Sequence, residues 1–143
     1  MYFSNHLLYI LSVEKWGQKD LITEEDLSID ELVRKMKKPE IGAIVSYLGM
    51  VRDEDSEIKG MEIRISEGEA GEELENLKRK ALDKFDIEAV EIVHREGSLK
   101  VGDNITLILV GAKHRKEAFR ACEYLIDALK MTKAIRRREL RQK

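Results

Sequence analysis

The sequence has few of the residues that form cross-links and few long apolar segments. Its 143 residues include one cysteine, Cys122, so neither an internal disulfide nor a cysteine-based zinc cluster can form within one chain. This fits a reducing compartment, and we expect a cytoplasmic location. A short apolar run at residues 7–13 is much too short to span a bilayer and lacks the flanks of a secretory signal. We therefore expect no membrane association and assign residues 1–16 to an N-terminal extension that packs on the body or mediates a contact.

An excess of charge of one sign is also lacking. The 26 basic and 28 acidic residues leave a formal net charge of -2, although charged residues make up 38% of the chain. The average for globular proteins is about 25%. The 43% hydrophobic content is enough for one core of ordinary size. We predict a single domain over residues 17–143 with a mixed, well-solvated surface.

Generic catalytic signatures are missing as well. The sequence contains no P-loop, no dinucleotide-binding glycine motif, no HExxH and no GxSxG. No second histidine or carboxylate stands at ligand spacing from His94, so a half-buried structural histidine is expected there rather than a metal ligand. Cys122 falls in an apolar helical stripe and is expected to be a core thiol. No metal or cofactor is predicted.

The spacing of apolar residues predicts three helices separated by strands. A short helix begins at Ser28, where Ser28 and Glu31 have capping-box spacing, and longer helices follow over residues 70–85 and 114–131. The third helix is expected to bury Phe119, Cys122 and Ile126 on one stripe. Strands are predicted over residues 41–51, 60–66, 89–95 and 105–112. The first of these is expected to be buried, and the last two to pair antiparallel. With a strand at each end of the chain, this order predicts an α+β fold with helices packed on a mainly antiparallel sheet.

Basic residues gather at the ends of these elements, where functional sites often lie. Arg52 follows the first long strand, and His114 and Arg115 stand at a helix start, which favours an anion such as phosphate. A solvated helix start is the simpler alternative. Residues 130–143 hold seven cations against one acid, Glu139. This tail suits an anionic ligand, nucleic acid or a solvated end, and the lack of interleaved aromatics argues against nucleic acid.

Two long stretches carry a family resemblance. The stretch ITEEDLSIDELVRKMKKPEIGAIVSYLGMVRD resembles the opening of the molybdopterin synthase large subunit, with its ITEE strand, short helix and glycine-containing strand that ends in VR. The stretch VEIVHREGSLKVGDNITLILVGAKHRKEAFRACEYLIDALK is similar to that family's later part, from its first HR pair and GD turn to the LK of the last helix. The similarity covers about residues 21–139, and its motifs lie far apart and recur in order. The resemblance to this MoaE-like family implies an α/β hammerhead-like fold.

The resemblance also implies sulfur transfer in molybdenum cofactor biosynthesis. In this family a homodimer of large subunits carries two small ubiquitin-like, MoaD-like subunits, which makes a heterotetramer. The C-terminal thiocarboxylates of the small subunits deliver sulfur to cyclic pyranopterin monophosphate, forming the molybdopterin dithiolene. By matching positions, Arg52, His114 and Arg115 are implied around the substrate, and Glu139 matches a family glutamate. Lys130 matches a required lysine, which is expected to hold or protonate the carbonyl-derived oxygen as sulfur adds.

One catalytic position departs from the family pattern. The family's second lysine lies seven residues after the first, and this position is Arg137 here. Arginine stays charged and cannot donate a proton at neutral pH, so Lys133 is considered as a substitute. Two alternatives to an active synthase subunit stay open. One is a catalytically impaired paralogue that binds the small subunit or the pterin, and the other is an RNA-binding α+β domain that uses the basic tail.

Overall fold

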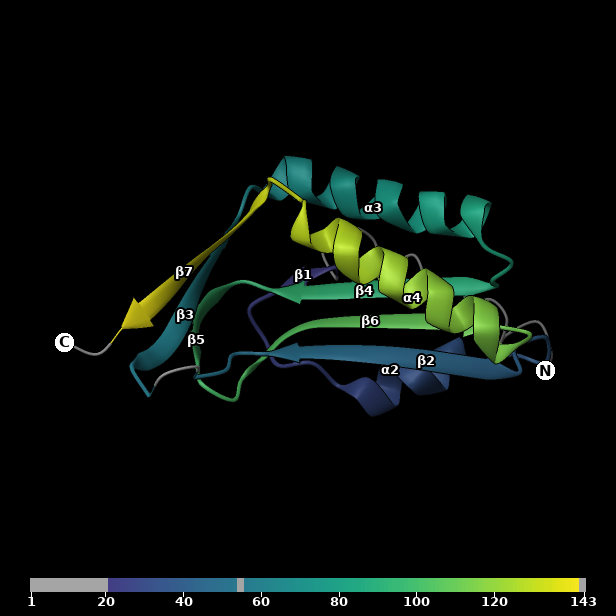
Figure 1. Cartoon of the computed structure of the whole chain (residues 1–143), viewed down its shortest axis with the longest axis horizontal. Coiled ribbons are helices and arrows are strands. Elements are labelled where there is room, and N and C mark those ends of the chain that lie inside the picture. Colours follow the sequence, from purple (N-terminus) through teal and green to yellow (C-terminus); the bar gives the residue numbers. More distant parts are fainter. Residues whose placement is uncertain (1–20, 54–55, 142–143) are drawn as a thin grey trace, which may run out of the picture.

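A computed structural model describes residues 21–53 and 56–141, over which the chain forms three helices and seven strands (Figure 1). The predicted N-terminal extension, residues 1–16, and the first four residues of the predicted domain lie outside the described residues. In chain order the described elements are β1 (Ile22–Thr23), α2 (Ile29–Met36), β2 (Ala43–Met50), β3 (Ile58–Ile65), α3 (Glu67–Lys84), β4 (Ala89–Arg95), β5 (Gly97–Lys100), β6 (Asn104–Ala112), α4 (Arg115–Lys130) and β7 (Ile135–Arg141).

The strands form two sheets. A four-stranded sheet has the order β1-β4-β6-β2, and a three-stranded sheet has the order β5-β3-β7. The short β1 is parallel to β4, and every other described pair is antiparallel. Figure 1 shows the three-stranded sheet at one end of the molecule, beyond the ends of the longer strands. The predicted α+β class with a mainly antiparallel sheet is confirmed, with the strands divided between two sheets.

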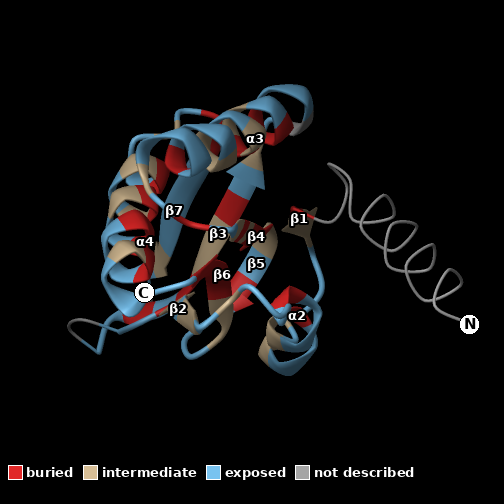
Figure 2. Ribbon diagram, turned by 90° about the vertical axis from the view of Figure 1, so that its right-hand side faces the viewer, coloured by how far each residue is buried: buried red, intermediate tan, exposed pale blue. Residues whose placement is uncertain are grey.

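Helices cover both faces of the four-stranded sheet. Helices α3 and α4 lie on one face and α2 lies on the other (Figure 1), so buried residues fill both layers (Figure 2). Alternate residues of β6 point to opposite faces, and Ile108 packs in the larger cluster while Leu107 and Leu109 pack in the smaller one with α2. Because both faces are covered, β6 is a nearly continuous apolar run.

Most predicted elements are confirmed. The strand over residues 89–95 has the bounds of β4, it pairs antiparallel with β6 as expected, and the three helices lie within three residues of their predicted bounds. Ser28 is the N-cap residue of α2, as its position predicted, but its side chain makes no capping hydrogen bond. The prediction that Phe119 is buried is wrong, because this residue is 60% exposed on the outer side of α4.

Two strand predictions need correction. Strand β2 was expected to be buried, but it is an edge strand whose residues are mostly half-buried. Strand β5 was not predicted, and the turn that contains Gly102, with a φ of +92°, leads from β5 into β6 rather than from β4. The basic tail forms β7, which pairs with β3 so that Arg137 lies opposite Ile63 and Glu139 lies opposite Met61.

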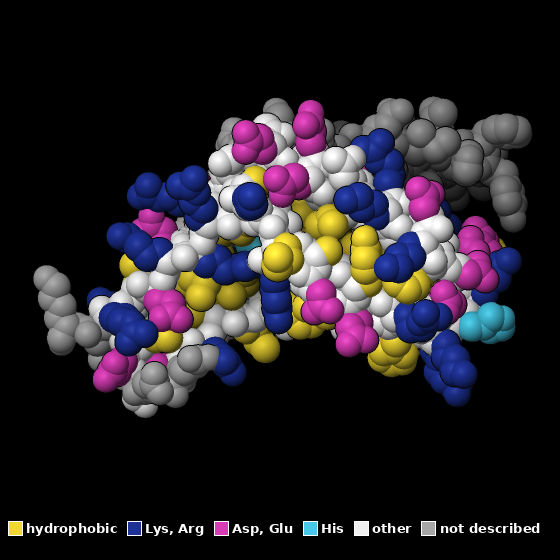
Figure 3. Space-filling view, turned by 45° about the horizontal axis from the view of Figure 1, so that its top comes forward, with side chains coloured by type: hydrophobic (Ala, Val, Ile, Leu, Met, Phe, Trp, Pro, Cys, Tyr) yellow, Lys and Arg dark blue, Asp and Glu magenta, His cyan; other side chains and the backbone are white. Residues whose placement is uncertain are grey.

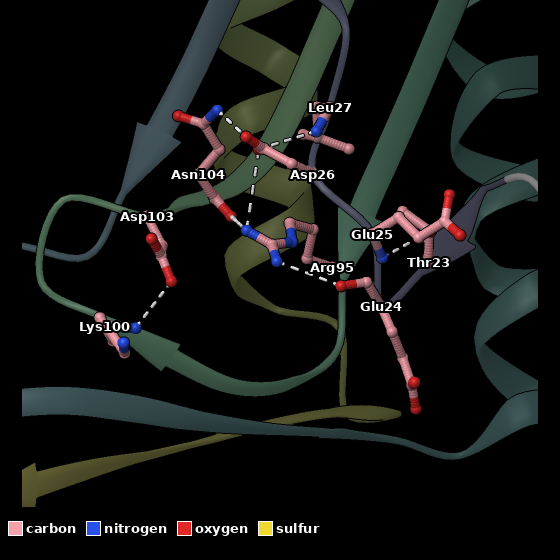
Figure 4. A network of polar contacts seen from close by, with 9 residues as sticks. All are labelled: Thr23, Glu24, Glu25, Asp26, Leu27, Arg95, Lys100, Asp103 and Asn104. Atoms are coloured by element: carbon pink, nitrogen blue, oxygen red, sulfur yellow. Dashed lines mark hydrogen bonds and ion pairs between the residues drawn. The ribbon is translucent and has the colours of Figure 1, made fainter.

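Arg95 ties the segment after β1 to the end of the four-stranded sheet (Figure 4). Its guanidinium donates to the carbonyl oxygens of Glu24 (3.1 Å) and Asn104 (3.3 Å). It also lies 3.8 Å from the Asp26 carboxylate, which accepts a hydrogen bond from the Asn104 amide at 3.0 Å. Two of these contacts connect residues more than 70 positions apart, and together the contacts hold β1 beside β4. The same strand end carries the neighbouring residue His94.

Candidate functional site

A cavity of about 540 Å³ lies where the end of α4 meets the two sheets. Its volume is within the range of small-molecule sites. Helix α4, two strands of each sheet and the loop after β2 contribute to its wall. The lining residues are Tyr47, Gly49, Met50, Arg52, Ile58, Met61, Ile105, Thr106, Ile126, Leu129, Lys130, Arg137 and Glu139. Figure 3 shows Lys and Arg side chains gathered around apolar surface at this end of the molecule.

Four of the residues identified from the sequence line this one cavity. Arg52 follows β2, Lys130 is the last residue of α4, and Arg137 and Glu139 come from β7. Arg137 and Glu139 share a face of β7 because they are two residues apart in a strand. The cavity therefore holds three cations and one carboxylate, and Glu139 also forms an ion pair with Arg141 at 3.2 Å. This balance favours an anionic ligand.

Lys130 and Lys133 differ in position. Lys130 follows Ile126 by four residues, a spacing that would continue the stripe of Cys122 and Ile126. The stripe does reach the cavity at Ile126 and Leu129, but Lys130 itself is exposed. Lys133 is exposed in the turn after α4 and is not part of the cavity lining in the described structure.

His114 and Arg115 lie at the opposite end of α4 from the cavity. His114 is the N-cap of α4 and Arg115 is its first residue, and both are exposed. The helix has 16 residues, which corresponds to roughly 24 Å at the α-helical rise. A single copy of the chain therefore does not bring His114 and Arg115 together with Arg52 and Lys130.

The side chain of His94 underlies the cavity at Arg137, a role that the sequence did not suggest. His94 is fully buried rather than half-buried, with its Nδ1 atom 2.8 Å from the carbonyl oxygen of Arg95. Its Nε2 atom lies 3.3 Å from Nη2 of Arg137. Burial lowers the pKa of His94 from 6.5 to about 4, so the imidazole is neutral at pH 7.

Burial also changes the properties of two other groups. Arg137 is exposed as a whole residue, but partial burial of its guanidinium lowers its pKa, and the nearby Tyr47 raises it. Arginine nevertheless remains charged at neutral pH. Burial raises the pKa of the Cys122 thiol to about 11, which confirms the prediction of a core thiol, because a nucleophilic cysteine needs a lowered pKa.

Over residues 21–53 and 56–141, no group of three or more His, Cys, Asp or Glu side chains is placed to hold a metal ion. Among the helices of the same residues, none combines the length and apolar character that a membrane span requires.

Two cavity features were missed in the sequence. His94 and Arg137 are 43 residues apart and belong to different sheets, so no local spacing joins them. Tyr47 belongs to the apolar strand β2, and its position in the sequence predicted only a packing role. A polar residue at an inward position of a buried strand, such as His94, was the one available indication, since buried polar groups require partners.

A sequence model of the MoaE protein family matches residues 22–132 of the chain. The matched range contains Arg52, His114, Arg115 and Lys130 and ends before Arg137. The molybdopterin synthase catalytic subunit of Pyrococcus abyssi is 37% identical over 118 residues, which cover 81% of this chain and 80% of that protein.

Solved structures give the same relationship. The chain matches the crystal structure of molybdopterin synthase from Staphylococcus aureus with a TM-score of 0.82 and 27% identity, over 88% of this chain and 93% of that one. It also matches a complex of subunits 1 and 2 of the molybdopterin-converting factor from Helicobacter pylori. That match has a TM-score of 0.71 and 26% identity, over 85% of this chain and 84% of the other.

Proposed function

Because the chain belongs to the MoaE family of molybdopterin synthase catalytic subunits, we propose that it transfers sulfur to cyclic pyranopterin monophosphate during molybdenum cofactor biosynthesis. The sulfur comes from the C-terminal thiocarboxylate of a small MoaD-like subunit, and the product is the molybdopterin dithiolene. The observation that carries this proposal is the cavity that Arg52, Lys130, Arg137 and Glu139 share. These residues come from three separate parts of the chain, so their convergence is a property of the fold.

The charges of the cavity suit each part of this reaction. Arg52 and Arg137 provide donors for the phosphate or for a developing oxyanion, because guanidinium groups bind such oxygens through several N–H groups. Lys130 provides an ammonium that can hold or protonate the carbonyl-derived oxygen as sulfur adds. Apolar side chains, among them Met61 and Ile126, line the rest of the wall and offer a surface for the flat pterin ring.

The small subunit is the proposed protein partner. The Helicobacter pylori structure that the chain matches is a complex of subunits 1 and 2 of its factor. A narrow C-terminal tail can enter the cavity, whereas a folded domain cannot fit a volume of about 540 Å³. The thiocarboxylate is also an anion, so it complements the excess of cations around it.

We further propose a homodimer, through which a second copy completes the site. Strand β2 is an edge strand of eight mostly apolar residues, and such edges tend to pair with another strand. It runs from Ala43, opposite Ala112 near the start of α4, to Met50, opposite Asn104 near the cavity. A two-fold axis would pair two β2 strands antiparallel. His114 and Arg115 of the second copy would then lie beside the cavity of the first.

One reconstitution tests the proposed function. The purified chain is mixed with a thiocarboxylated small subunit and cyclic pyranopterin monophosphate, and dithiolene product is measured. We expect product with the wild type and with Arg138→Gln, because Arg138 lies on the other face of β7 and pairs with Glu62 at 2.8 Å. Binding of the small subunit without product would favour the impaired paralogue. Salt-sensitive binding to polynucleotides without product would favour the RNA-binding alternative.

A further inference from the structure

His94 lies at the junction of the two sheets, directly behind a charged residue of the cavity. It belongs to β4 of the four-stranded sheet, whereas Arg137 belongs to β7 of the three-stranded sheet. The His94 side chain has no exposed surface, so its ring nitrogens have no access to bulk water. Both nitrogens have protein partners, Arg95 on one side and Arg137 on the other. A buried polar ring of this kind fixes the positions of the groups that it contacts.

The two contacts of His94 define its tautomer. A guanidinium group has only N–H donors and no acceptor, so Nε2 of His94 must accept the hydrogen bond from Nη2 of Arg137. A neutral imidazole with a bare Nε2 carries its proton on Nδ1, and this proton faces the carbonyl oxygen of Arg95 at 2.8 Å. The backbone of β4 thereby selects the form of His94 that can hold an arginine.

We propose that His94 is a positioning residue that holds the Arg137 guanidinium at the cavity as a fixed donor for an anionic oxygen of the substrate or of the reacting thiocarboxylate. His94 uses one of the five N–H groups of Arg137, and Arg137 is at the same time a lining residue of the cavity. An arginine cannot replace the proton-donating lysine of the family pattern. It can stabilise negative charge without reorganisation if its orientation is fixed beforehand.

The neutral charge of His94 supports this arrangement. A protonated His94 would place an N–H group against a guanidinium, and its contact with Arg137 would become repulsive. The low pKa of His94, about 4 because of its burial, keeps the imidazole neutral throughout the neutral range. Tyr47, which lines the same cavity, is the other titratable group that acts on Arg137.

The first test uses the wild-type chain and requires no activity. Nitrogen-15 NMR of the histidine rings at pH 7 should show His94 with a protonated Nδ1 and a bare Nε2. A His94 ring that carries its proton on Nε2, or on both nitrogens, would overturn the proposal. This result is independent of sulfur transfer, so it separates the positioning role from the proposed function on which its kinetic consequence rests.

The second test uses two substitutions at one position. His94→Phe keeps a ring but removes both hydrogen bonds, whereas His94→Gln places an amide oxygen near the former Nε2 and keeps an acceptor for Arg137. We expect His94→Phe to lower turnover in the reconstituted reaction and the affinity for inorganic phosphate, each about tenfold, as for a lost charged hydrogen bond. We expect His94→Gln to recover both quantities to within about threefold of the wild type.

A control and a crystal structure complete the test. Arg138→Gln removes a cation of the same strand on the opposite face, and it should change neither quantity by more than about twofold. In a crystal structure of His94→Phe we expect the Arg137 guanidinium to have left its wild-type position. Equal turnover and phosphate affinity in folded His94→Phe and wild type, with Arg137 unmoved, would refute the positioning role.

Discussion

Lys130 is the last residue of α4, where its side chain lines the cavity although the residue is exposed. It makes no ion pair within the described part of the chain, so its removal should change the free energy of unfolding by less than about 0.5 kcal/mol. If its ammonium stabilises the transition state, Lys130→Ala should lower turnover on the order of a hundredfold with a nearly unchanged melting temperature. Steady-state kinetics and a thermal melt measure both. Normal turnover of this variant in an active system would refute the catalytic assignment.

Arg137→Lys tests whether Arg137 impairs catalysis or contributes to it. A disabled site would gain activity when the family residue is restored. The hydrogen bond from Arg137 to His94 instead indicates a site built around a guanidinium, which offers more donors than an ammonium. We therefore expect turnover to fall about fivefold to tenfold, with dimer formation unchanged. Single-turnover kinetics give the measurement, and a faster Arg137→Lys variant would contradict this expectation.

The buried imidazole of His94 also predicts how stability depends on pH. In the unfolded chain His94 takes up a proton near pH 6.5, but in the folded chain only near pH 4. As pH falls through this window, the unfolded state binds the extra proton, so stability present above pH 6.5 is lost. The loss should amount to about 3 kcal/mol. In urea unfolding, the free energy of unfolding of the wild type should fall by this much more between pH 7 and pH 4 than that of His94→Phe. Parallel pH profiles of the two proteins would contradict the prediction.

At the scale of elements, the Arg95 network holds β1 and the segment after it against the sheet. Arg95→Met keeps much of the aliphatic stem but removes the donors to Glu24 and Asn104. We expect stability to fall by about 1–3 kcal/mol, because two hydrogen bonds from a charged donor to the carbonyl oxygens of Glu24 and Asn104 are lost. Faster hydrogen exchange is expected at the amides of His94 and Glu96, which bond to residues of the β1 segment. Arg64→Gln is the control, since Arg64 is 80% exposed and a surface ion pair contributes little.

The sequence predicted helices and central strands well because their signals are local. Apolar residues at helical spacing placed α3 and α4, and the long apolar run of β6 has no other simple interpretation. Strand β5 has four residues and little apolar character, so it becomes a strand only because β3 lies beside it. Phe119 was predicted to be buried but is exposed. An apolar residue on the edge of a stripe is buried only if another element covers it.

The candidate site was predictable only through the family resemblance. Arg52, Lys130, Arg137 and Glu139 gave no spacing from which a common cavity could be inferred, because their proximity depends on how β7 folds back onto β3. The contact between His94 and Arg137 depends in addition on how the two sheets meet. Long-range geometry of this kind is not encoded in local periodicity. This explains why His94 received no functional role from the sequence.

At the scale of the whole molecule, the geometry separates the proposed site residues into two groups. Arg52, Lys130 and Arg137 lie at the cavity, and His114 and Arg115 lie at the other end of α4, roughly 24 Å away by the helical rise. Both groups can act on one substrate only if a second copy supplies the second group. Sedimentation equilibrium at micromolar concentration should therefore show a dimer, and a monomer would remove the basis for a shared site.

Mixing two inactive variants tests the shared site directly. In a dimer of Lys130→Ala with His114→Ala, one cavity keeps its own Lys130 and receives an intact His114 from the other copy, while the second cavity loses both. Random exchange of equal amounts makes half of the dimers mixed, so about a quarter of wild-type turnover should return. As the control, each variant is assayed alone at the same total concentration and should stay inactive. If His114 acted within its own chain, or acted nowhere near the cavity, mixing would restore no activity beyond the sum of the two variants. Subunit exchange is confirmed beforehand by mass spectrometry of differently labelled chains, so that absence of recovery counts against the shared site rather than against exchange.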